Sequence, residues 1–250
     1  MTDTSSIVML IGLTFVAAGF VKGVVGMGLP TVAMGLLSLV MEPAAAAALL
    51  IVPSLVTNVW QLVTGAKFAA LARRLATLML AILIGTSLSI GVLTGTSSTQ
   101  ASAALGVVLA VYGATGLAGR RFTVPRRAEL WLSPVAGLAT GIIAGATGVF
   151  AIPAVPYLNS LGLAKEELIQ VLGLSFTVST VALAAALALS GKYQLVAAGY
   201  SLLAVAPALV GMFFGQVVRS RLRPEAFRRW FFVGLVALGT YMFARALLQA

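Results

Sequence analysis

Long apolar runs separated by short polar stretches dominate this chain of 250 residues. Most runs are about 20 residues long, which is enough for a helix to cross the hydrocarbon core of a bilayer. Two runs are shorter, and at 1.5 Å per residue each reaches only about 20 Å. The pattern predicts an all-α protein that crosses a membrane many times, since a membrane β-barrel would show alternation instead. The expected segments are 7–26, 29–41, 44–64, 75–94, 101–119, 130–148, 150–161, 168–190, 195–218 and 230–248.

The order of segments is the same in both halves of the chain: long, short, long, long, long. The stretch GFVKGVVGMGLP at 19–30 aligns with GIIAGATGVFAIP at 141–153, with glycines at matching places. Such internal similarity indicates a repeat. We therefore expect a first transmembrane repeat at 1–119, a basic cytoplasmic linker at 120–129 and a second repeat at 130–250.

Charge indicates how the two repeats are oriented. Twelve of the sixteen basic residues lie in three loops, within 67–74, 120–127 and 219–229. The positive-inside rule places these loops in the cytoplasm and the uncharged loop GTSSTQ at 95–100 outside. Both termini are then outside, and the repeats have inverted topology, as in many secondary transporters. A parallel duplication would instead put basic loops at equivalent positions of the two halves, which this sequence does not do.

Composition excludes several classes of function. The chain is 60% hydrophobic and only 9% charged, and it has no cysteine and no histidine. Thiol chemistry and histidine-ligated metals are therefore excluded, and no motif predicts a cofactor or a nucleotide. An enzyme is disfavoured because no pair of carboxylates lies within a span. The net charge of +10 is explained by membrane orientation, so nucleic acid is not an expected partner.

The glycine-rich stretches predict a break in the helix at each hairpin. Glycine adopts conformations that other residues resist, and proline suits the first turn of a helix. Short helices are expected to start near Leu29 or Pro30 and near Ile152 or Pro153. Their N-terminal N–H groups would favour an anion. The alternative is that Gly19, Gly23 and Gly26 simply form a small-residue packing face.

Lys22 is a charged residue inside an apolar segment. A charge in such a place is costly and usually functional, which favours contact with an anion. The alternative is that the long side chain extends to the cytoplasmic interface. The second repeat has Ala144 at the matching position, so any role of Lys22 is asymmetric.

Polar residues follow each hairpin in the next long helix. The spacing of Ser54, Asn58 and Gln61 places them on one helix face, where they can replace the hydration shell of an anion. The second half offers Ser175, Thr177 and Thr180, although such hydroxyls often bond to their own helix instead. Glu42 and Glu166 come just after each short segment. They are candidate gates or proton sites, or else residues that stabilise a helix start.

The hairpin pattern and the length of the chain resemble the sulfite exporter TauE/SafE family of bacterial inner-membrane permeases. The mid-chain copy departs from the family pattern at Phe150, where glycine is often found. The resemblance implies export of sulfite or a small organosulfonate such as sulfoacetate by alternating access. A passive anion channel and a membrane subunit of a larger complex are the alternatives. The resemblance to the family also implies an anion path, lined by Gly23, Gly26, Gly28, Pro30, Gly145, Gly148 and Pro153.

Overall fold

The structure is a computed structural model that describes residues 4–119, 122–191, 195–219 and 224–249. Helices make up the regular structure of these residues, and no strand occurs among them. The helices are α1 (Thr4–Val25), α2 (Leu29–Leu37), α3 (Pro43–Val63), α4 (Phe68–Arg74), α5 (Ala76–Gly95), α6 (Ser98–Ala118), α7 (Arg126–Thr147), α8 (Ala154–Asn159), α9 (Lys165–Leu189), α10 (Leu195–Leu203), α11 (Val205–Arg219) and α12 (Pro224–Leu248).

The expected all-α membrane fold is confirmed. Within the described part of the chain, eight helical stretches are long and apolar enough to cross a membrane. They correspond to the long segments of the hydropathy pattern. One of them, Ala198–Arg219, combines most of α10 with α11, which are separated at Ala204.

Two local features differ from the expectation. The basic loop after α3 contains the short helix α4, which turns the chain through the basic end before α5 begins. The segment expected at 130–148 also starts earlier, because α7 already begins at Arg126. Pro125 occupies the position before the first turn of α7, and Arg, Ala and Glu are good helix formers, so the helix extends into the basic stretch.

The short helices start where the glycines and prolines predict. α2 begins at Leu29, after Gly26 and Gly28 with φ of 84° and 104°. Only glycine adopts such angles readily, so these two residues reverse the chain between α1 and α2. Pro153 immediately precedes α8, which is only six residues long. Neither helix is long enough to span about 30 Å alone.

The second hairpin returns to the end of the molecule from which it started. The backbone N–H of Val124, just before α7, donates to the carbonyl of Ser160, just after α8, at 2.9 Å. The hydroxyls of Ser133 in α7 and Tyr157 in α8 also lie 2.6 Å apart. The helix α8 therefore folds back along α7 and does not cross the molecule as a separate span.

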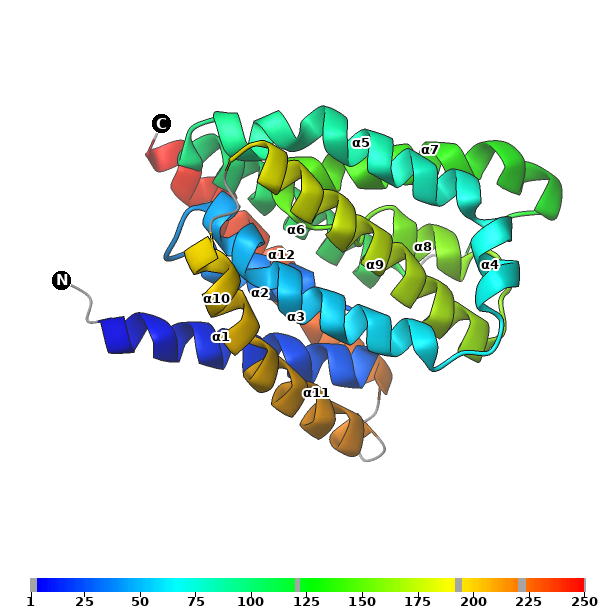
Figure 1. Cartoon of the computed structure of the whole chain (residues 1–250), viewed down its shortest axis with the longest axis horizontal. Helices are drawn as coiled ribbons and strands as arrows, with labels where there is room; N and C mark the ends of the chain where they lie inside the picture. Colours follow the sequence, from blue (N-terminus) through cyan, green and yellow to red (C-terminus); the bar gives the residue numbers. More distant parts are fainter. Residues whose placement is uncertain (1–3, 120–121, 192–194, 220–223, 250) are drawn as a thin grey trace.

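Four helix pairs form the body of the protein: α1 with α11, α3 with α9, α5 with α7, and α6 with α12 (Figure 1). Each pair joins one helix from each expected repeat. Glycines allow backbones to approach closely, as is typical where membrane helices touch. Gly85 of α5 faces Gly141 of α7, and Gly106 of α6 faces Gly239 of α12.

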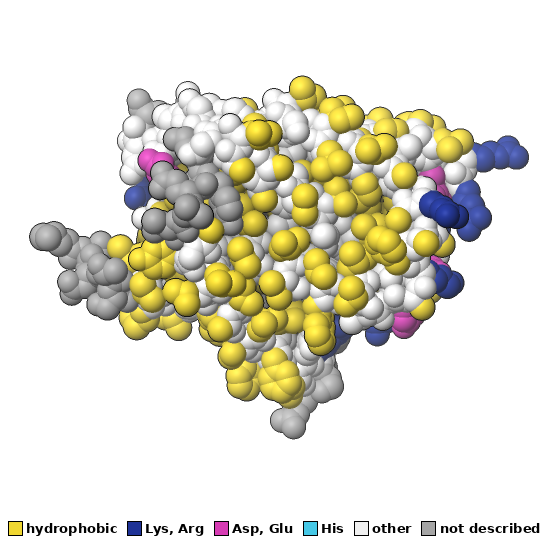
Figure 2. Space-filling model, viewed as in Figure 1, with side chains coloured by type: hydrophobic (Ala, Val, Ile, Leu, Met, Phe, Trp, Pro, Cys, Tyr) yellow, Lys and Arg dark blue, Asp and Glu magenta, His cyan; other side chains and the backbone are white. Residues whose placement is uncertain are grey.

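The surface matches a protein covered by lipid. Hydrophobic side chains cover much of the visible face, whereas Lys and Arg side chains gather mainly at one end (Figure 2). The three tryptophans, Trp60, Trp131 and Trp230, are exposed, and each is near a helix end that faces a basic loop. Tryptophan favours membrane interfaces, so these residues indicate a boundary there. Helix α1 starts and α12 ends at the opposite end of the molecule.

Candidate functional site

Lys22 lies in the last turn of α1 and points into the protein. Its side chain is only 4% exposed. The ammonium donates to Thr57 Oγ1 at 3.1 Å and to Asn58 Oδ1, both on α3. The alternative in which this side chain extends to the membrane interface is therefore wrong for this conformation.

A hydrogen-bond chain leads from Lys22 across the two halves. Asn58 accepts from Lys22 and donates through Nδ2 to Thr180 Oγ1 of α9 at 3.3 Å. The Thr180 hydroxyl in turn donates to the carbonyl of Phe176 in its own helix. The fully buried amide of Asn58 thus connects the lysine of the first half to a helix of the second half.

Pro53 interrupts the backbone hydrogen bonding of α3 just before these polar residues. Pro53 lies inside the helix and has no N–H, so the carbonyl of Leu49 loses its helical partner. The hydroxyl of Ser201 from α10 donates to that carbonyl at 2.7 Å and accepts from the N–H of Val52 at 3.0 Å. Ser201, a residue of the second half, therefore makes the hydrogen bonds to the α3 backbone just before the stretch that holds Ser54, Thr57 and Asn58.

This arrangement predicts that Ser201 and Pro53 are energetically coupled. Ser201→Ala leaves the buried Leu49 carbonyl without a partner and is expected to cost about 1–3 kcal/mol of stability. In a Pro53→Ala background the helix supplies its own N–H, so the same change should cost clearly less. Thermal unfolding of the four proteins of this double-mutant cycle in detergent measures the coupling. Equal losses in both backgrounds would contradict it.

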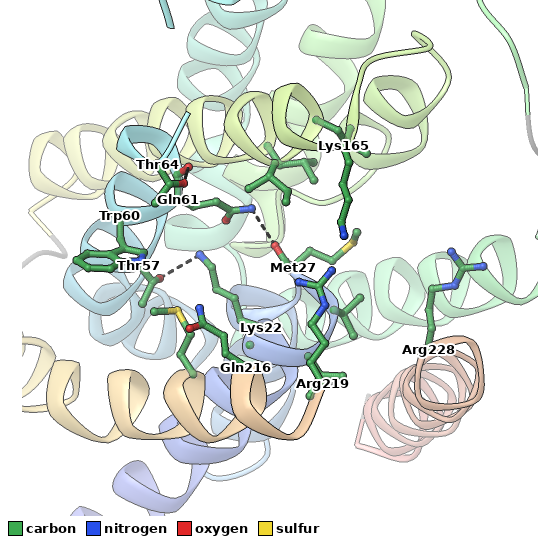
Figure 3. Close-up of a pocket in the computed structure, with 18 of the residues that line it drawn as sticks. Lys22, Met27, Thr57, Trp60, Gln61, Thr64, Lys165, Gln216, Arg219 and Arg228 are labelled. Carbon is green, nitrogen blue, oxygen red and sulfur yellow. Dashed lines mark hydrogen bonds between the residues drawn. The ribbon is translucent and has the colours of Figure 1, made fainter. Parts of the chain in front are cut away.

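A cavity of about 430 Å³ extends from Lys22 to the basic end of the molecule (Figure 3). Its walls come from α1, α3, α9 and α11, with the start of α12 at the mouth. Trp60, Leu172 and Met212 contribute apolar surface, whereas Thr57 and Gln61 contribute polar groups. The volume suits a small molecule, and Lys22 places an amino group that can carry positive charge at its buried end.

The mouth of the cavity is also basic. Lys165, Arg219 and Arg228 line it together with a single acidic residue, Glu225. In Figure 3 the side chains of Lys165 and Arg219 point into the cavity. None of the three basic residues forms a salt bridge with a carboxylate of the described residues. Such an excess of positive charge attracts anions from solution and raises their local concentration.

Several buried polar groups near this site have no partner among the residues that the structure describes. The hydroxyls of Ser54 on α3 and of Ser175 and Ser179 on α9 belong to this group, as does Oε1 of Gln61. A buried polar group without a partner is costly. Of these four groups only Gln61 lines the cavity, and its Oε1 accepts hydrogen bonds, whereas the three serine hydroxyls are donors on α3 and α9 outside the cavity lining. The hydroxyls of Thr177 and Thr180 instead donate to carbonyls four residues earlier in their own helix. These two threonines offer acceptor oxygens in this conformation.

The predicted site residues fall into separate groups. Lys22, Gly23, Gly26 and Gln61 line the cavity. Asn58 and Thr180 join it through hydrogen bonds to Lys22 and to each other. Gln61 also donates to the carbonyl of Gly26 at 3.1 Å, which ties α3 to the chain break after α1.

The hairpin glycines have two structural roles. Some of them allow helices to pack closely, and others break the helix and reverse the chain. A Cβ at Gly23 would meet backbone atoms of Gly215 and Gln216 at 2.9 Å, so this glycine allows α1 and α11 to pack. Gly19 likewise faces backbone atoms of α11. Gly26 has open space around it and a positive φ, which marks the break.

Other predicted residues lie away from this cavity. Gly145 packs against Thr86 and Ser89 of α5, and Gly148, with φ of 72°, contacts the side chain of Met34 in α2. Pro30 is buried in the first turn of α2, close to the positive-φ residue Gly28. These hairpin residues, with Pro153 before α8, stand outside the cavity lining.

The two candidate gate residues are exposed helix-start residues in this conformation. Glu42 immediately precedes α3, and its side chain makes no capping hydrogen bond. It lines a second cavity of about 350 Å³ at the opposite end of the molecule, together with Arg245. Glu166 lies in the first turn of α9, where the helix dipole favours a carboxylate.

Several residues that line the cavity were not among the predicted site residues. They are Thr57 on α3, Lys165 at the start of α9, and Gln216 and Arg219 near the end of α11. Arg219 was predicted only as part of a basic loop, and the packing of α11 against α1 and of α9 against α3 brings these residues to the cavity. The single polar residue Gln216 in the apolar run of α11 was the one signal available.

Side-chain bonds at the basic end hold α3 against α9. The amide of Gln170 donates to the carbonyls of Leu62 and Gly65 and accepts from the N–H of Lys67. Lys67 also forms an ion pair with Glu167 at 2.6 Å, and this hydrogen bond raises the pKa of Lys67. The exposed ion pair contributes little by itself, so the buried Gln170 is the stronger connection beside the cavity.

Comparison with known proteins identifies the family. The family model described as "Sulfite exporter TauE/SafE" matches residues 11–242. The chain belongs to the TauE/SafE family. No curated protein and no solved structure matches it.

Membership in the TauE/SafE family confirms the resemblance drawn from the hairpin pattern. Together with the eight apolar helices, it makes the protein a multi-pass membrane transporter. The description is that of a transporter family and not of an enzyme family. Within the described residues, no group of His, Cys, Asp and Glu could hold a metal ion.

Proposed function

We propose that the protein is a secondary transporter that exports a small sulfur-containing anion, sulfite or an organosulfonate such as sulfoacetate, across the bacterial inner membrane. The observation that carries this proposal is the buried Lys22 at the closed end of a basic cavity. An oxyanion bound there would accept from the ammonium group. A charge-assisted hydrogen bond of this kind is shorter and stronger than a neutral one.

Alternating access between two inverted repeats fits the helix pairing. If the repeats are related by a pseudo-two-fold axis, α1 corresponds to α7 and α5 to the α10–α11 pair. The contact of α1 with α11 then mirrors that of α5 with α7, while α3 with α9 and α6 with α12 are each their own mirror pair. The site at α3 and α9 would lie near the axis, where inverted-repeat transporters bind their substrates.

The cavity would face the cytoplasm in this conformation. It reaches the end of the molecule that carries the basic residues, and basic loops favour the cytoplasmic side. Both termini would then lie outside the cytoplasm, with the division into repeats at 1–119 and 130–250. Cytoplasmic substrate would enter past Lys165 and Arg219 and reach Lys22.

Sulfite flux into proteoliposomes tests the function. Lys22→Gln keeps a polar side chain but removes the charge, and we expect saturable flux to fall by about 10-fold to 100-fold, as the loss of a charged hydrogen bond predicts. Lys67→Gln is the matched control, because Lys67 is an exposed lysine outside the cavity. No saturable flux by the correctly folded wild-type protein would overturn the proposal. Non-saturating flux would indicate a passive channel.

A further inference from the structure

Lys22 has no anionic partner in this structure. Of the six acidic residues, Asp3 lies outside the described residues. Glu129 pairs with Arg74, and Glu167 pairs with Lys67. Glu42, Glu166 and Glu225 are exposed at helix starts. Among the described residues, the ammonium of Lys22 therefore has only neutral oxygen atoms as hydrogen-bond partners.

The elements around Lys22 supply few other charges. Helix α3 contributes Thr57 and Asn58, which are neutral. Helix α9 contributes Lys165 to the cavity, α11 contributes Arg219, and α12 contributes Glu225 and Arg228. Glu225 is the one acidic group in the lining, and its exposed position beside Arg228 is at the mouth. A protonated Lys22 in the empty site is thus a buried positive charge among other positive charges.

The number of hydrogen bonds distinguishes the two protonation states of Lys22. A protonated lysine has three N–H donors and no acceptor. A neutral amine has two N–H donors and one lone pair. Thr57 and Asn58 accept two hydrogen bonds, so they satisfy every donor of the neutral amine. The protonated form has a third donor, which points to no further oxygen of the described residues, and an anion in the adjacent cavity can accept from it.

We propose that Lys22 carries one proton with each anion, so that the protein is a proton–anion symporter. This inference rests on the proposed transport function and adds the coupled ion. The anion and the proton bind together, and their charges compensate at the buried site. After the site reopens, the anion leaves and the N–H bond of the ammonium breaks. The electron pair stays on nitrogen, the proton passes to water, and the neutral carrier returns.

Lys22→Arg separates proton coupling from anion binding. Arginine keeps the positive charge and the donors, but it does not release its proton in proteins. Such a carrier can bring one anion in and another out, yet it cannot return empty with an uncompensated buried charge. Two activities are distinguished: exchange of one anion for another, and net uptake, which requires the carrier to return empty. Both are expected to fall, but the ratio of net uptake to exchange should fall by about tenfold or more relative to wild type.

The experiment uses labelled sulfoacetate and proteoliposomes with a pH-sensitive dye in the lumen. The sulfonate and the carboxylate of sulfoacetate are both ionised near neutral pH, so this anion brings no titrating proton of its own. Exchange is measured with equal unlabelled sulfoacetate inside, and net uptake is measured without it. Wild-type net uptake should acidify the lumen by about one proton per anion beyond the change in protein-free liposomes, because a lysine carries one titratable proton. Wild-type exchange should leave the luminal pH unchanged.

Two outcomes would overturn the coupling. They are wild-type net uptake without acidification, and a ratio of net uptake to exchange in Lys22→Arg that equals the wild-type ratio. If Lys22→Arg fails to fold, the wild-type proton measurement decides alone. Absence of both net uptake and exchange in wild type refutes the transport function itself, and with it the coupling. Exchange without acidification during net uptake refutes only the coupling.

Discussion

Replacing Asn58 by aspartate should abolish anion transport while the protein stays folded. Asn58 Oδ1 already accepts from Lys22, so Asn58→Asp places a carboxylate oxygen on the same donor. The internal ion pair neutralises the charge that would attract the substrate and repels an incoming anion. We expect sulfite flux to fall by about 100-fold or more, since close opposite charges at a buried site interact strongly.

Stability separates this mechanism from simple damage. The new ion pair compensates for the loss of the Asn58 hydrogen bond to Thr180, so thermal stability should stay near that of wild type. Sulfite should raise the melting temperature of wild type but not of Asn58→Asp, because only a bound ligand stabilises the folded state. The control is Thr180→Val, which removes the same hydrogen bond between Asn58 and Thr180 without adding charge. It should lower flux only a few-fold, by about 1 kcal/mol. Near-normal flux in Asn58→Asp would contradict a binding role for Lys22.

A valine at Gly85 should prevent the contact between α5 and α7. A Cβ there would lie 2.8 Å from the backbone nitrogen of Ile142 and 3.1 Å from the carbonyl carbon of Gly141. These are backbone atoms and cannot rotate away as a side chain does, so the helices must separate. We expect a loss of about 3 kcal/mol or more, at the upper end of overpacking effects.

Gly91 provides a matched control on the same helix. It is exposed, and a Cβ at this position meets nothing within 4 Å. Gly91→Val should therefore leave the melting temperature in detergent nearly unchanged, whereas Gly85→Val should lower it strongly or reduce the yield of monodisperse protein. Equal effects of the two changes would mean that intrinsic helix preference, and not the α5–α7 contact, determines the loss.

Hydropathy predicted the membrane helices well because the bilayer constrains each helix independently of its neighbours. A buried backbone without water must bond within its own segment, so an apolar run of sufficient length becomes a helix. The signal that predicted the start of α2 at Leu29 was also local, because Gly28 and Pro30 restrict the backbone of only the two or three residues beside them. The helix α4 was missed because its seven residues lie within the basic stretch 67–74, which was interpreted as a loop.

Glycine spacing did not distinguish packing from chain reversal. Gly19, Gly23 and Gly26 share a pattern, yet the first two contact α11 and the third marks the break. The difference depends on α11, which is nearly 200 residues away in the chain. A local pattern carries no information on which distant helix will lie opposite.

The local sequence thus predicted the class, the helices, the expected cytoplasmic side and the candidate residues for an anion site. Whether those residues form a site was decided by packing. Lys22 reaches Asn58, 36 positions away, and Asn58 reaches Thr180, another 122 positions away. Packing also determined that Thr57 and Thr180 donate to their own helices while Ser54 and Ser175 have no partner in the described structure. Hydropathy and spacing act over a few residues, whereas burial and hydrogen bonding at this site arise only when distant helices meet.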